Sequence, residues 1–91
     1  MIHAIVLITA ERDALGTLGG ALAQIDGVTE AYSVTGDWDF VAVVRVREQN
    51  RLAELIANEL AQLPGIERTT TLLAFQAFSQ HDLEALFSIG G

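Results

Sequence analysis

Two similar heptapeptides determine the fold of this chain: Leu22-Ala23-Gln24-Ile25-Asp26-Gly27-Val28 and, 38 positions later, Leu60-Ala61-Gln62-Leu63-Pro64-Gly65-Ile66. The same offset aligns two apolar runs, 4–8 and 42–46. Each half of the chain is therefore predicted to hold a strand, a helix and a glycine-containing exit into a second strand, which is a duplicated β-α-β unit.

The two predicted helices each have one apolar face. Gly27 and Gly65 follow the last apolar residue of each helix, where a left-handed C-cap is favoured, and Pro64 prevents the second helix from continuing. Both helices are therefore expected to pack on a sheet. The apolar positions recur at near-helical spacing: Leu15, Leu18, Leu22 and Ile25 in the first helix, and Leu52, Ile56, Leu60 and Leu63 in the second.

The middle of the chain predicts a β-hairpin from about 29 to 46, with its tight turn at 35–39. The predicted fold is α+β, a ferredoxin-like βαββαβ sandwich of the dimeric α/β-barrel type. The 91 residues enclose one core, so residues 1–91 are expected to form a single domain. Ser79 with Asp82 resembles a capping box and predicts a short C-terminal helix.

Composition excludes several classes of function. The net charge is −7 and the five basic residues are scattered arginines, so direct nucleic-acid binding is not expected. The chain has no cysteine and two isolated histidines, which predicts no metal site and no cofactor. Because it shows neither a secretory start nor a run of about 20 apolar residues, we expect a soluble, cytoplasmic protein without a membrane segment.

Both faces of the predicted sheet are apolar. Residues of the first strand alternate between Val6 and Ile8 on one side and Ile5 and Leu7 on the other, and the strands at 40–46 and 71–78 do the same. With both helices on one face, the other face needs a cover, and two chains associating through their sheets would provide it. The alternative is that the short C-terminal helix folds over its own sheet, but it is small for that task. We therefore expect at least a homodimer.

The turn Gly36-Asp37-Trp38-Asp39 is the first candidate binding site. Glycine exposes backbone N–H groups that can receive a carboxylate, and an aspartate can accept from an ammonium, so a small zwitterion could bind here. The alternative is structural: the two aspartates satisfy the backbone of the turn and Trp38 packs in a dimer contact.

The threonine run 69–71 is the second candidate, because Thr69 and Thr71 share a face of the last strand and could offer hydroxyls to a ligand. The alternative is simple β propensity. We expect this strand to run antiparallel to the first and the third, with its start at the far end of the sheet from Gly36. A site that uses both groups would then need different subunits.

These elements, in this order, resemble the ligand-binding (RAM) domain of the Lrp/AsnC feast/famine regulators over about residues 2 to 78. The matching motifs are the helix exits 22–28 and 63–66, the Gly-Asp-aromatic-Asp hairpin followed by Phe40, and the threonine strand. Trp38 stands where the family usually has tyrosine. We expect no counterpart here of the family's helix-turn-helix DNA-binding domain.

The resemblance implies a homodimer that assembles further into an octamer-like ring and binds an amino-acid effector between dimers near the hairpin. It favours Gly36, Asp37, Trp38, Asp39, Thr69 and Thr71 as ligand-binding positions. Without a DNA-binding domain, the chain is expected to act as a sensor and to pass its signal through full-length Lrp/AsnC regulators or another protein.

Two other functions are compatible with this fold. Dimeric α/β-barrel enzymes, such as small monooxygenases and isomerases, share the topology. Only His3, Tyr32, Arg45 and Gln76 interrupt the apolar strands, however, and they form no evident acid–base pair, so no catalytic residue is predicted. The third possibility is an oligomerisation module that binds no ligand.

Overall fold

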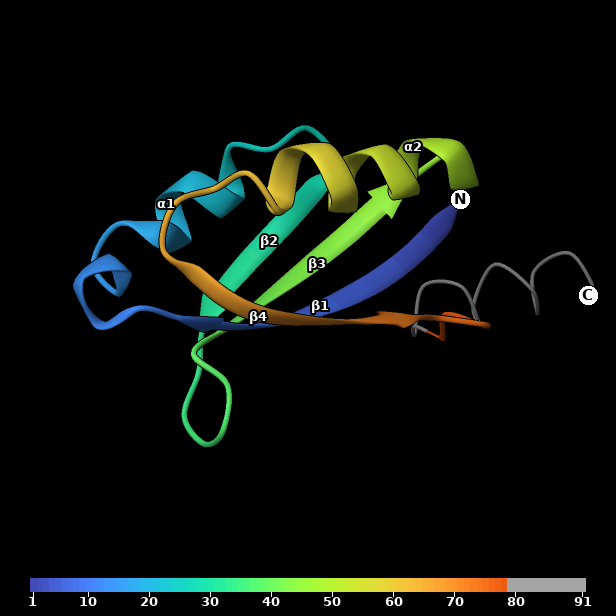
Figure 1. Ribbon diagram of the computed structural model, residues 1–91. Helices are drawn as coiled ribbons and strands as arrows, with labels where there is room; N and C mark the ends of the chain where they lie inside the picture. The colour runs from blue at the N-terminus through green and yellow to red at the C-terminus, as the bar shows by residue number, and fades with distance from the viewer. Residues whose placement is uncertain (79–91) are drawn as a thin grey trace, which may run out of the picture.

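A computed structural model of the chain describes residues 1–78 and has a four-stranded sheet with the helices on one side (Figure 1). The helix expected from Ser79 lies outside the described residues. The elements are β1 (Ile2–Ala10), the 3-10 helix η1 (Arg12–Ala14), α1 (Leu18–Ala23), β2 (Val28–Ser33), β3 (Phe40–Val46), α2 (Gln49–Glu54), the π-helix η2 (Leu55–Leu60) and β4 (Ile66–Leu73). The predicted βαββαβ order is confirmed.

The strand order is β2-β3-β1-β4, and every neighbouring pair is antiparallel. Ile8, near the end of β1, therefore faces Phe40 at the start of β3 and Thr69 near the start of β4. The expectation that β4 runs antiparallel to β3 was wrong. Two strands that are each antiparallel to the same central strand are parallel to one another, so β3 and β4 begin at the same end of the sheet.

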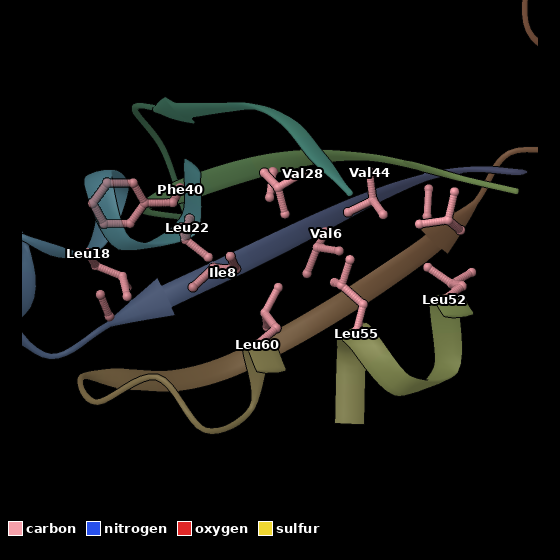
Figure 2. Close-up of a cluster of buried hydrophobic side chains, with 14 of the residues drawn as sticks. Val6, Ile8, Leu18, Leu22, Val28, Phe40, Val44, Leu52, Leu55 and Leu60 are labelled. Atoms are coloured by element: carbon pink, nitrogen blue, oxygen red, sulfur yellow. The ribbon is translucent and has the colours of Figure 1, made fainter. Parts of the chain in front are cut away.

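The core lies between the sheet and the helices, and Figure 2 shows its side chains converging from both layers. Alternate residues of β1 and β3 face the helices and are buried, as the period of two requires. The largest side chains that are almost completely enclosed are Val6, Ile8, Leu18, Leu22, Val44, Leu55 and Leu60.

The helices depart in detail from the predicted apolar faces. Leu15 is 47% exposed, because the segment after β1 forms η1 and α1 begins only at Leu18. The second helix changes to π-helical winding at Leu55, and the Ala61 amide donates to the Ile56 carbonyl five residues earlier. The wider turn buries Leu55 and Leu60, five positions apart, and leaves Ile56 half-buried.

Both helix exits have the left-handed glycines that the sequence predicted, with φ of 107° at Gly27 and 94° at Gly65. At Gly65 a Cβ atom would lie 2.2 Å from the Cβ atom of Ala14, and the Gly65 carbonyl accepts a hydrogen bond from the Glu11 amide. Glycine is therefore required here by both backbone conformation and close packing.

No helix within residues 1–78 covers the other side of the sheet, which we call the open face (Figure 1). Its central side chains are apolar, as predicted, and several are exposed, including Ile5 at 39% and Leu72 at 49%. The last strand was predicted to reach residue 78, which was wrong, because β4 ends at Leu73. No helix among the described residues is long and apolar enough to cross a membrane. The centre of the open face is formed by Ile5, Leu7, Tyr32, Val41, Val43, Thr70 and Leu72. The same register places four polar or charged residues around that centre, His3, Glu30, Arg45 and Arg68.

Candidate functional site

The candidate site lies in the hairpin turn, residues 34–39, which projects beyond the sheet (Figure 1). The Val34 amide donates to the Asp39 carbonyl at 3.0 Å, and the Asp39 amide donates to the Ile8 carbonyl at 2.9 Å. Gly36 has a φ of 100° and no atom within 4 Å of a Cβ built on it. The base of the turn is thus tied to β1, and its tip is open.

The two aspartates of the turn are placed differently. The Asp39 carboxylate is half-buried, and its Oδ2 atom accepts a hydrogen bond from the Ala10 amide at 2.8 Å. This role is structural, as the alternative interpretation predicted, but the backbone group that Asp39 satisfies belongs to β1 and not to the turn. The Asp37 side chain is exposed and forms no hydrogen bond or ion pair within residues 1–78. Asp37 is therefore the carboxylate of this turn that remains available to a ligand.

Trp38 contacts the start of β4 within the same chain. The Arg68 guanidinium carbon lies 5.0 Å from the centroid of the Trp38 ring, a cation–π distance. This contact crosses β1, because Arg68 pairs with Thr9 on that strand. Sequence reasoning missed Arg68, and the correct direction of β4 would have indicated it, because it brings the two segments to one end of the sheet.

Thr69 and Thr71 lie on the helix side of β4, beside Ile8 and Val6 of β1. Thr69 is half-buried at the hairpin end, and Thr71 is exposed and two residues further along the strand. Because β1 lies between β3 and β4, Thr69 is about 10 Å from the base of the hairpin. The structure thus brings the turn and Thr69 to one end of the sheet but keeps them on separate strands.

The open face next to the turn carries one perturbed ionisable group. The Tyr32 hydroxyl donates a hydrogen bond to the Glu30 carboxylate, and this bond, with a smaller contribution from desolvation, raises the pKa of Tyr32. No three acidic or histidine side chains gather as a metal site requires in the part of the chain that the structure describes.

The fold is shared with a class of ligand-binding regulatory domains. A model of the family described as the Lrp/AsnC ligand binding domain matches residues 3–83, so the chain belongs to that family. The family and its regulator relatives are binding proteins and not enzymes, so the interpretation as a dimeric α/β-barrel enzyme is set aside.

The chain is similar to both regulators and solved structures of the family. The Leucine-responsive regulatory protein of Haemophilus influenzae is 25% identical over 76 residues, which are 84% of this chain and 46% of that protein. The protein TTHA0845 from Thermus thermophilus superposes with a TM-score of 0.82 at 42% identity, covering 88% of this chain and 100% of that one. AsnC of E. coli gives a TM-score of 0.77 at 25% identity, covering 84% and 52%.

The chain spans about half or less of the length of the curated relatives it matches. The matched part is the ligand-binding domain.

Proposed function

We propose that this domain senses an amino acid, which it binds at the hairpin turn between subunits. The observation that carries the proposal is the contrast within the turn: Asp39 is engaged by the Ala10 amide, whereas Asp37 is exposed and unpaired among the described residues. An amino acid offers an ammonium group to the Asp37 carboxylate and a carboxylate to the backbone amides near Gly36.

The position of the turn favours a site shared by two subunits. The turn projects beyond its own sheet (Figure 1), and the side of it around Gly36 is open. A ligand held there by one chain would stay largely in water, whereas small-molecule sites enclose most of their ligand. A second subunit packed against the turn would supply the missing walls. Thr69 and Thr71 of a neighbouring chain are the groups that we propose to line it.

The assembly that we propose begins with a homodimer in which two open faces pack together. Each face offers several exposed apolar side chains, and burial of such a surface favours association. Dimers then join through their hairpins into a ring, for which we propose an octamer. Because the ligand binds only the assembled form, it stabilises that form by linkage.

The relatives suggest what the sensor acts on. The Haemophilus relative is named a leucine-responsive regulatory protein and is about twice as long as the match. We propose that this domain works in the cytoplasm and mixes with such longer Lrp/AsnC regulators, so that its ligand changes their assembly.

A thermal-shift screen against the twenty amino acids, with light scattering on each hit, tests the proposal. A ligand at about ten times its Kd stabilises the folded form by about 1.4 kcal/mol, which raises the Tm of a domain of this size by about 5–10 °C. We expect at least one hit that also changes the assembly mass, and we expect Asp37→Ala to abolish both effects.

Asp13→Ala is the matched control. Asp13 is also an exposed aspartate, but it lies on η1 outside the turn. This variant should respond to the ligand as the native protein does. If no amino acid shifts the Tm or the assembly mass, the domain is an oligomerisation module and the proposal is wrong.

A further inference from the structure

We propose that a second binding site, for a small anion carrying a phosphate or carboxylate group, lies at the end of the sheet opposite the hairpin. A cavity of about 380 Å³ opens there, within the size range of small-molecule sites. This inference does not depend on amino-acid binding at the hairpin. The cavity is lined by Met1, Asp26, Gly27, Arg45, Val46, Arg47, Glu48 and Arg51.

The walls of this cavity are held by specific contacts. The Gly27 carbonyl accepts a hydrogen bond from the Arg45 amide at 2.8 Å, which fixes the turn before β2 to the end of β3. A Cβ atom on Gly27 would lie 2.8 Å from Leu55 and 3.0 Å from Val46, so only glycine permits this approach without a shift. The site is therefore formed before any ligand arrives.

Arg51, on α2, forms another wall of the cavity and ties it to the turn before β2. Its Nη2 atom donates to the Asp26 carbonyl at 2.7 Å, and its Nη1 atom lies 2.7 Å from a Glu59 carboxylate oxygen and 3.8 Å from one of Glu54. The hydrogen bond to Glu59 raises the pKa of Arg51. Arg51 is thus a fixed part of the wall whose charge is balanced by its own helix.

Arg45 and Arg47 are the groups that remain for a ligand. Both are exposed, and neither forms an ion pair with any described residue. Both line the cavity, and neighbouring guanidinium groups repel one another unless an anion lies between them. Guanidinium groups bind phosphate and carboxylate with paired hydrogen bonds.

The local charge distinguishes this cavity from the rest of the molecule. Three of the five basic residues of the chain line it together with two acidic residues, in a protein whose net charge is −7. The two acids, Asp26 and Glu48, repel an anion placed near them. Their repulsion favours a small ligand over an extended one.

The test is a titration of the full chain with inorganic phosphate, followed by NMR of the backbone amides and the arginine Nε–H groups at constant ionic strength. We expect saturating shifts at Arg45, Arg47 and Gly27 and none in the hairpin. Succinate and its neutral analogue succinamide form the second arm. Saturation with phosphate, with succinate or with both supports the proposal and identifies the preferred anionic group, and succinamide should produce no shift.

The double variant Arg45→Gln, Arg47→Gln should bind the anion at least about tenfold more weakly, because each lost hydrogen bond to a charged group changes affinity by about that factor. Arg12→Gln, which removes an exposed arginine at the hairpin end, is the matched control and should bind normally. The proposal is wrong if phosphate and succinate produce only the non-saturating shifts that chloride produces. It is also wrong if the double variant binds like the native protein, or if it loses only subunit association.

Discussion

At the scale of single residues, the Asp39 carboxylate accepts a hydrogen bond from the Ala10 amide, while Asp37, two positions away, extends into solvent. Sequence alone offered no means of distinguishing them, because both are aspartates in a glycine turn. The difference depends on β1, which lies next to the base of the hairpin in space and about thirty residues away in the chain.

Asp39→Ala should therefore lower the free energy of unfolding by about 1.5–3 kcal/mol, the usual value of a hydrogen bond to a charged group. Asp39→Asn should cost less, because its amide oxygen can still accept. Asp37→Ala should change stability by no more than about 0.5 kcal/mol, as exposed substitutions usually do. Urea unfolding at one fixed protein concentration measures all three. Equal losses of stability in the two alanine variants would contradict the assignment of a structural role to Asp39 alone.

Tyr32 is the only tyrosine of the chain, so its ionisation can be followed directly by ultraviolet absorbance. Its pKa is raised above the ordinary 10.0 by the hydrogen bond to Glu30. Folding therefore favours the neutral phenol: the stabilisation is present below pH 10 and is lost as the pH rises through the raised pKa.

Glu30→Gln removes the negative charge beside the phenol, so Tyr32 should titrate at a lower pH in that variant than in the native protein. Thr29→Ser, a change at the neighbouring exposed position of the same strand, should leave the titration unchanged. Coincident titration curves for the Glu30 variant and the native protein would show that the hydrogen bond has no influence.

At the scale of the elements, the repeat of the two heptapeptides was sufficient to predict the order of strands and helices, the hairpin and the two glycine exits. The repeat was not sufficient to predict which residues of the second helix are buried. A spacing of 3.6 residues favoured Leu52, Ile56 and Leu60, whereas the π-helical turn buries Leu55 with Leu60. The winding of a helix responds to the surface on which it packs, and the apolar residues at 55 and 56 suit either phase.

The direction of β4 follows from the duplication and not from helix packing. The duplication itself makes the second half run as the first does, with β3 and β4 parallel across β1. The contact between Trp38 and Arg68 depends on that geometry and could not be derived from either segment by itself.

The exit from the second helix provides a sharp test of local packing. Gly65→Ala should lower the free energy of unfolding by about 2–4 kcal/mol, because a left-handed alanine costs about 1–2 kcal/mol and the contact with Ala14 adds the cost of overpacking. Gly36→Ala is the matched control, since Gly36 has a similar φ of 100° and open space around it. The Gly36→Ala variant should lose only the stability that the left-handed alanine costs. Equal losses of stability in the two variants would mean that Ala14 shifts to make room for the new methyl group.

At the scale of the whole molecule, the open face is the feature on which the proposed homodimer rests. The helices bury one face of the sheet, and the other exposes apolar side chains between two edge strands. That both faces are apolar was evident from the sequence. That a second copy covers the open face is part of the proposed function.

Val43→Glu tests this surface. Val43 is half-buried near the centre of the open face, and a carboxylate there would be buried without a partner in a face-to-face dimer. We expect the variant to elute and scatter light as a monomer. Ala57→Glu, an exposed change on η2 away from the open face, should keep the native mass. A dimer in both variants would exclude the open face as the interface.

The most direct measurement is a crystal structure of the assembled protein grown with the amino acid that gives the largest thermal shift. We predict density for that amino acid between subunits, with its ammonium group near the Asp37 carboxylate and its carboxylate near the amides of the turn. Density held within one chain, or only in the arginine-lined cavity at the other end of the sheet, would contradict binding at the hairpin between subunits.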